Sequence, residues 1–287
     1  MSDARILDRG YRRYDGPRLG VAGAVRSLAW HSALRALGLR RSVWAKLLPL
    51  AAVGIAYVPA TVFVGVAALL PEQLVDATGL LPGYADYYGF ISAAIVLFVA
   101  LVGPEVLCPD RRHRMLGLYL ASPLSRDSYL VAKVLAVVPV LALVTLGPPL
   151  LLLVGFTFAD AGPDGAGELL GILARIVAGG VVVAAAYTAV SLAASSLTDR
   201  RAVASAGIIL VLLVSGVATG ALVASGADER LLLLNLSVVP FELVQRLYGE
   251  AGQVEVSTLA LVAANLAWTL AAAALLRARY HRLRITR

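Results

Sequence analysis

Charged residues, cysteine, histidine and lysine are all scarce in this chain of 287 residues. Each shortage argues against a particular fold class or kind of site. Only 15% of the residues are charged, against about 25% in soluble domains. The single Cys108 excludes an internal disulfide framework, and with only three histidines we expect no metal site. Neither lysine, Lys46 or Lys133, follows a glycine, so the chain has no phosphate-binding P-loop of its own.

The motifs of common hydrolases are absent as well. There is no His-Glu-x-x-His sequence, and no Gly-x-Ser-x-Gly elbow with a histidine partner. The three histidines, His31, His113 and His281, all stand in basic segments, where solvated side chains are expected. We therefore expect no catalytic residue and no cofactor bound by this chain.

Apolar residues, by contrast, make up 60% of the chain, and the mean hydropathy is +0.83. A helix needs about 20 apolar residues to cross a bilayer. Six windows satisfy this length, which predicts an all-α membrane protein rather than a barrel of short alternating segments. The predicted spans cover about 44–70, 87–107, 129–159, 169–197, 202–224 and 256–276.

The flanking segments divide the chain into three parts: 1–43 before the spans, the spans and their connections over 44–276, and a basic tail over 277–287. Because the first apolar window starts only near residue 44 and no small-residue cleavage pattern follows it, we expect no signal peptide. Arginine far outnumbers lysine, and alanine, leucine and valine are abundant, which suggests a GC-rich bacterial genome.

Basic residues are sorted across the predicted spans. The N-terminal segment, the second and fourth connections and the tail together hold 22 Lys and Arg, whereas the other connections hold two. The positive-inside rule then places both termini in the cytoplasm, which agrees with an even number of spans. This sorting and the attraction of anionic lipids account for the net charge of +7, so we expect no nucleic-acid partner.

The segment 105–126, between the second and third spans, is the most distinctive stretch of the chain. It is dense in arginine and resembles a short helix for which Asp110 would cap the start and Pro123 would mark the end. Arg111, Arg112 and Arg114 are forked donors suited to carboxylates on a partner. The alternative is an interfacial helix bound only to lipid headgroups.

Two other segments predict short helices outside the spans. Residues 21–41 indicate an interfacial elbow helix, although a mobile basic arm is the alternative. Residues 231–239 are apolar but too short to cross, and 240–248 form an amphipathic pattern, which predicts external re-entrant or interfacial helices before the last span.

Few polar groups fall inside the predicted spans. Gly216 and Gly220 form a small-xxx-small face where a second helix could approach closely. Arg175 is interpreted as an interfacial anchor, with a substrate counter-ion as the alternative. Polar residues that could line a substrate path, although such residues more often bond to backbone, are Thr145, Thr188, Ser191, Thr219 and Asn265.

Two cytoplasmic motifs together resemble those of the permease subunits of type-2 ABC exporters. The first covers residues 11–18 (Tyr-Arg-Arg-Tyr-Asp-Gly-Pro-Arg), and the second covers 108–112 (Cys-Pro-Asp-Arg-Arg) followed by 118–125 (Leu-Tyr-Leu-Ala-Ser-Pro-Leu-Ser). The layout of the whole chain is similar too: elbow helix, six spans, a charged loop after the second span and short external helices before the sixth.

This resemblance implies a permease subunit in the bacterial cell membrane, driven by separate ABC ATPase subunits that bind the ATP and Mg. It also implies a second permease, either a copy or a related chain, with the first and fifth spans meeting across the dimer. The residues implied to contact or shape contact with the ATPase are Glu105, Pro109, Asp110, Arg111, Arg112, Arg114, Ser122 and Pro123. From their own chemistry, Met115 and Tyr119 could enter an apolar groove of that partner. Those implied near the start of the elbow helix are Tyr11, Arg12, Tyr14, Gly16 and Arg18.

Three functions therefore remain open at the level of sequence. The first is an ATP-driven exporter subunit, for which a hydrophobic or amphipathic cargo such as a drug, antibiotic or lipid-like molecule is expected because no charged lumen is evident. The second is a membrane scaffold or regulator without transport. The third is a gradient-driven transporter, which the shortage of acidic residues inside the spans disfavours.

Overall fold

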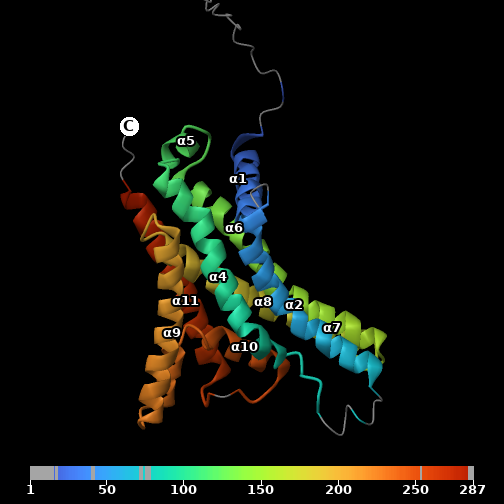
Figure 1. Cartoon of the computed structure of the whole chain (residues 1–287). Helices are drawn as coiled ribbons and strands as arrows, with labels where there is room; N and C mark the ends of the chain where they lie inside the picture. The colour runs from blue at the N-terminus through green and yellow to red at the C-terminus, as the bar shows by residue number, and fades with distance from the viewer. Residues whose placement is uncertain are drawn as a thin grey trace, which may run out of the picture.

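The computed structural model describes residues 16, 19–39, 43–70, 74, 79–252 and 254–283, and for 43–45 only the backbone. The part of the chain so described contains helices and no strands (Figure 1). In chain order the helices are α1 (Gly20–Ala36), α2 (Val43–Leu69), α4 (Tyr87–Arg112), α5 (Leu116–Leu120), α6 (Arg126–Thr145), α7 (Gly147–Phe158), α8 (Ala166–Ser195), α9 (Arg201–Ala224), the 3₁₀ helix η1 (Glu229–Leu234), α10 (Val239–Tyr248) and α11 (Thr258–Arg282).

Six helical stretches of the described chain are long and apolar enough to cross a membrane, which confirms the prediction of an all-α protein with six spans. They are α2, α4, α6 with α7, α8, α9 and α11. Helix α4 is the central one: 61% of its apolar window is buried, and it packs against α2, α6, α8 and α9. The windows of α9 and α11 are only 17% buried, so these two helices present most of their apolar surface outward.

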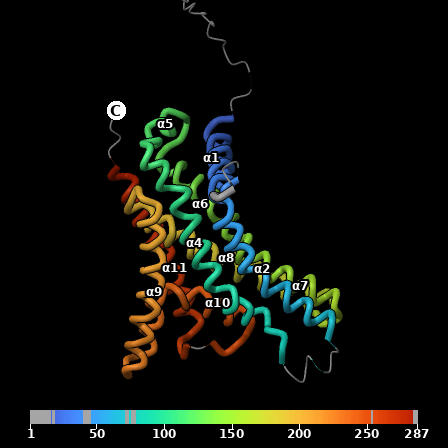
Figure 2. The backbone as a smooth tube through the Cα atoms, viewed as in Figure 1, coloured from blue at the N-terminus to red at the C-terminus, as the bar shows by residue number. Residues whose placement is uncertain are grey.

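The third span consists of two helices, because α6 ends at Thr145 and α7 begins at Gly147. Pro148 and Pro149 stand in the first turn of α7, where a missing N–H costs least. The hydroxyl of Thr145 donates to the carbonyl of Gly180 at 3.0 Å and so ties the break to α8. Helix α7 then runs beside α2, as Figure 2 shows.

The end of α4 differs from the sequence prediction. The helix continues through Pro104 and Pro109 to Arg112, so Asp110 belongs to its last turn and does not cap a new helix. The amide of Met115 donates to the carbonyl of Asp110 at 2.8 Å, and Arg114, with φ +54°, donates to Arg111 at 3.1 Å. This is the Schellman arrangement that commonly ends helices. The short helix that follows, α5, has only five residues and starts after Met115.

Between α9 and α11 the chain forms two short helices, η1 and α10, at the end of the molecule opposite α5 (Figure 1). They are held to the spans through backbone carbonyls. The indole of Trp268 donates to Leu233 at 3.0 Å, and the hydroxyl of Tyr187 donates to Ser237 at 3.0 Å. The short helices expected before the last span are therefore present.

Candidate functional site

One end of the molecule gathers the segments that the sequence singled out. The C-terminal turns of α4, all of α5, the start of α6, the α8–α9 turn (residues 196–200) and the C-terminal end of α11 lie there, with α1 alongside (Figure 1). Helix α1 packs on α6 and α4. This end therefore combines residues from five helices and the α8–α9 turn.

A buried charge cluster joins three of these helices. The carboxylate of Asp110 in α4 accepts from Lys133 of α6 at 2.6 Å and from Arg35 of α1 at 2.9 Å. The side chains of Asp110 and Lys133 are 2% and 0% exposed. Tyr129 donates to Asp110 Oδ2, the same oxygen that Lys133 contacts, at 3.0 Å, and Lys133 donates to Ser32 of α1 at 2.9 Å. Each buried charge thus has a partner of opposite sign and further hydrogen bonds, as burial requires.

Burial by itself opposes the charge on Arg35, but the Asp110 carboxylate outweighs it, so the pKa of the guanidinium is raised. The same guanidinium donates to the carbonyl of Val106 at 3.1 Å. Arg35 was not selected from the sequence. Helix α1 carries both Arg26 and Arg35, and nothing in the sequence marks Arg35 as the one that pairs with a residue 75 positions further on.

Three tyrosines cover this cluster. Tyr119 of α5 and Tyr129 of α6 have ring centroids 5.6 Å apart, and Tyr280 of α11 lies 5.6 Å beyond Tyr129. The ammonium of Lys133 lies 5.7 Å from the Tyr119 ring and 5.2 Å from the Tyr129 ring, within range of cation–π attraction. Burial, and then the Asp110 charge, raise the pKa of Tyr119. Helix α5 is therefore linked to the charge cluster.

Several residues of the predicted contact set make contacts within the chain. Asp110 is buried within α4 and paired with Lys133 and Arg35, so its carboxylate is not available to a partner, and Pro109 is buried in the same turn. The guanidinium of Arg111 donates to the carbonyls of Ser196 and Thr198, the latter at 3.1 Å, and therefore joins α4 to the α8–α9 turn. Glu105 accepts from Arg201 at 2.6 Å and therefore joins α4 to the start of α9.

What remains accessible lies on and around α5. Leu118 is 65% exposed, and Met115 and Tyr119 are half-buried. We name this the α5 surface: Arg114, Met115, Leu118, Tyr119, Ser122 and Pro123. Arg112 is exposed too, but it lines a separate cleft with the α8–α9 turn.

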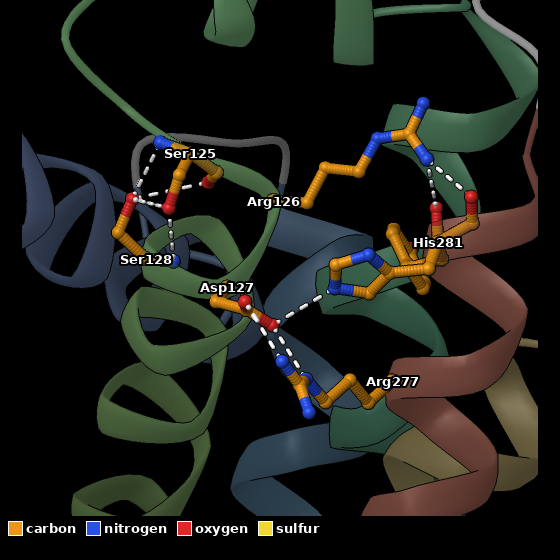
Figure 3. A network of polar contacts seen from close by, with 7 residues as sticks. Ser125, Arg126, Asp127, Ser128, Arg277 and His281 are labelled. Atoms are coloured by element: carbon orange, nitrogen blue, oxygen red, sulfur yellow. Dashed lines mark hydrogen bonds and ion pairs between the residues drawn. The ribbon is translucent and has the colours of Figure 1, made fainter.

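A second polar network, which the sequence did not suggest, ties the start of α6 to the end of α11 (Figure 3). Asp127 accepts from Arg277 at 2.9 Å and contacts His281 at 3.0 Å. Arg126 donates to the carbonyls of Tyr280 and His281 in the last turn of α11 and to that of Leu283 just after it.

Beside this network, Ser125 and Ser128 form a capping box that starts α6. That local pattern is the part of Figure 3 that the sequence could have revealed. The contacts across 150 or more residues could not be found in this way.

The N-terminal motif falls mostly outside the described residues. Tyr11, Arg12, Tyr14 and Arg18 lie there, and only Gly16 is described, as a half-buried residue. The elbow segment itself is helical over Gly20–Ala36, close to the predicted start and five residues short of the predicted end.

The polar residues considered for a substrate path mostly satisfy backbone groups. Ser191 donates to the carbonyl of Thr188 at 3.2 Å, and Thr219 donates to Ser215 at 2.7 Å. The hydroxyl of Thr188 is buried with no hydrogen-bond partner among the described residues. Asn265 lines a cavity of about 10 Å³ with Tyr187 and Trp268, and the other four predicted residues do not reach it.

A larger, mostly apolar groove of about 430 Å³ lies between α4, α9 and α10. Phe241 of α10 and Ile209 of α9 contribute to it. The full lining is Ser92, Ala93, Val96, Leu97, Ile209, Ser237, Val238 and Phe241. No residue of this groove was among the predicted path residues.

The two glycines of the predicted small-xxx-small face differ in their surroundings. At Gly216 a side chain would meet Asn235 of the same chain at 3.7 Å, whereas at Gly220 nothing lies within 4 Å. Only Gly220 is therefore open to a second helix.

Arg175 is exposed, and its guanidinium carbon lies 5.9 Å from the ring centre of Tyr248, within cation–π range.

Comparison with known proteins agrees with this architecture. A family model described as ABC-2 family transporter protein matches residues 44–278, which include all six apolar helices except the last residues of α11. No curated protein matches the chain. Since the match covers most of the chain, this multi-pass membrane protein belongs to the ABC-2 transporter family.

Proposed function

We propose that the chain is the permease subunit of an ATP-driven exporter and that the α5 surface is the binding site for a separate ABC ATPase. Family membership supports the permease role. The ATP and Mg would be bound by the partner, and the complex would stand in a bacterial cell membrane. A second permease, a copy or a related chain, would complete it.

The observation that carries the coupling role is the connection between α5 and the bundle. A partner that pushes on α5 moves Tyr119, which packs on Tyr129 and the Lys133 ammonium. Lys133 and Asp110 in turn hold α6 to α4. Such a chain of close contacts transmits rigid-body motion, because a packed core resists continuous deformation.

The cargo we propose is hydrophobic or amphipathic. The groove between α4, α9 and α10 is lined by apolar residues with two serines, Ser92 and Ser237. Ligand sites for apolar molecules have this composition, a mainly hydrophobic wall with a few polar groups. The exposed apolar faces of α2 and α9 and the open Gly220 support a dimer in which these helices meet.

The test is a mild-detergent pull-down of the tagged chain from its native membrane, with protein identification and an ATPase assay of the eluate. Leu118→Glu places a charge in the centre of the α5 surface and should remove the ATPase from the eluate. Leu80→Glu is the matched control, because Leu80 is also an exposed leucine but lies in the connection before α4, away from α5. That variant should retain the partner.

An ATPase that stays with Leu118→Glu as with Leu80→Glu would contradict the proposed binding site. A clean preparation without any nucleotide-binding partner would favour the scaffold or regulator. Transport that stops when the proton gradient is collapsed while ATP stays high would favour the gradient-driven alternative. A change at Arg111 is less suitable for this test, because its guanidinium holds the α8–α9 turn.

A further inference from the structure

The end of α4 and the start of α9 enclose a cleft of about 750 Å³ that the proposed ATPase binding site does not use. Its lining comes from two segments that are almost 90 residues apart in the chain. The residues are Pro109 and Arg112 from α4 with His113 just after it, and Asp199, Arg200, Arg201 and Ala202 from the α8–α9 turn and α9. Arg111 and Glu105, through their bonds to Thr198 and Arg201, fix the two walls against each other.

The cleft holds unused positive charge. Arg201 is paired with Glu105 at 2.6 Å. The guanidinium groups of Arg112 and Arg200 are exposed, and within the described parts of the chain they make no ion pair or hydrogen bond. Among the described residues that line the cleft, Asp199 is the only acid. With the Arg201–Glu105 pair counted as neutral, Arg112 and Arg200 outweigh Asp199, so the lining attracts an anion.

The backbone adds to this attraction. Arg200 stands at the N-cap of α9, and no side chain caps that end. The first amides of a helix lack intrahelical acceptors, and the helix dipole favours negative charge beside them. Phosphate oxygens satisfy such amides and arginine side chains together.

The position of the cleft indicates which phosphate it fits. Both α4 and α9 are apolar enough to cross the membrane, and the cleft lies between the C-terminal end of α4 and the N-terminal end of α9. The next residue of α9, Val203, is 53% exposed, so apolar surface adjoins the cleft on the membrane side. Phospholipid phosphates lie at this depth, and basic pockets between spans on the cytoplasmic side bind anionic headgroups.

We infer that this cleft is a binding site for the headgroup phosphate of an anionic phospholipid, with Arg112 and Arg200 as the charged contacts. Arg112 then pairs with a phosphate and not with a carboxylate of a partner protein. The site would hold the α4–α9 end at the membrane surface. The inference does not depend on the proposed transport function, since lipid binding is measured on the chain alone.

The experiment is native mass spectrometry of the purified full chain in detergent, titrated with phosphatidylglycerol or with phosphatidylcholine of the same acyl chains. The wild-type chain should bind at least one phosphatidylglycerol more tightly than phosphatidylcholine. Arg112→Gln with Arg200→Gln should weaken that binding roughly thirtyfold, given the usual contribution of two surface arginines. Equal affinities for the two lipids would overturn the inference.

The matched control is Arg279→Gln with Arg282→Gln, which removes the same charge from exposed arginines in the last turn of α11. It should keep the phosphatidylglycerol affinity. If both double variants lose affinity equally, general charge attraction explains the binding and the cleft is not the site.

Two further measurements guard against misfolding and against the wrong source of phosphate. Asp199→Asn removes the acid from the lining and should strengthen phosphatidylglycerol binding several-fold, a gain that a misfolded protein would not give. Inorganic phosphate at millimolar concentration should not displace the lipid. Displacement would indicate a site for free anions, and unchanged affinity in Asp199→Asn would also count against the cleft.

Discussion

At the scale of single residues, the most consequential group is the Asp110–Lys133–Arg35 cluster. It contains two cations and one anion, and Asp110 is the acid that both cations contact. The transfer of such charges out of water is costly, and their attraction offsets the cost only with good geometry and further hydrogen bonds. Tyr129, Ser32 and the carbonyl of Val106 provide those bonds.

This arrangement predicts that the three charges are unequal in importance. Asp110→Asn leaves the fully buried Lys133 without a counter-charge and should destabilise the fold by about 3–5 kcal/mol. Lys133→Met should cost less, because Arg35 still pairs with Asp110. Thermal unfolding of the purified variants in detergent measures the order.

The control for this prediction is Asp127→Asn, which removes the exposed carboxylate that contacts Arg277 and His281 and should cost much less than Asp110→Asn, because solvent screens exposed ion pairs. The double variant Asp110→Asn with Lys133→Met should be more stable than Asp110→Asn alone, because it removes the stranded cation. A double variant less stable than the single one would show that charge balance does not govern this cluster.

At the scale of elements, close helix contacts depend on glycines at specific places. A side chain on Gly103 of α4 would come within 2.7 Å of the Ser191 side chain and 3.3 Å of its backbone on α8. Gly207 of α9 has nothing within 4 Å. The same residue type therefore serves close packing in the central helix and has no packing role at Gly207 of the outer helix.

The two glycines predict opposite effects of one substitution. Gly103→Ala should destabilise the fold by about 1–3 kcal/mol, because α4 and α8 must move apart. Gly207→Ala should be neutral or stabilise by up to about 1 kcal/mol through helix propensity. Unfolding temperatures in detergent distinguish the two, and equal shifts would contradict the role of Gly103 in the α4–α8 contact.

At the scale of the whole molecule, the two ends differ in content. One end carries α5, the α8–α9 turn and the arginine-rich end of α11, and the other carries η1, α10 and the α9–η1 turn (Figure 1). The distribution of basic residues then predicts that the α5 end faces the cytoplasm.

This orientation can be tested with two matched exposed serines. Ser122→Cys, after α5, should react with an impermeant maleimide only from the cytoplasmic side, and Ser225→Cys, after α9, only from outside. The native Cys108 is 0% exposed and should give little background. Labelling of both variants from one side would contradict the orientation.

The sequence by itself determined the class of protein and its six apolar helices. Span length and hydropathy are properties of a continuous segment, and a bilayer accepts such a segment wherever its neighbours lie. The short helices α5 and α10 could be predicted for the same reason, since turns and amphipathic patterns are local, although α5 starts after Met115 and not at Asp110.

Tertiary structure alone decided which charged residues are buried and which are exposed. The register of α4 against α6 and α1 directs Asp110 inward, and the close approach of the α8–α9 turn gives Arg111 its carbonyl partners. Arg112 and Arg114, on either side of the end of α4, stay exposed. Neighbours in sequence thus differ in role because helix packing, which depends on distant residues, sets the environment of each side chain.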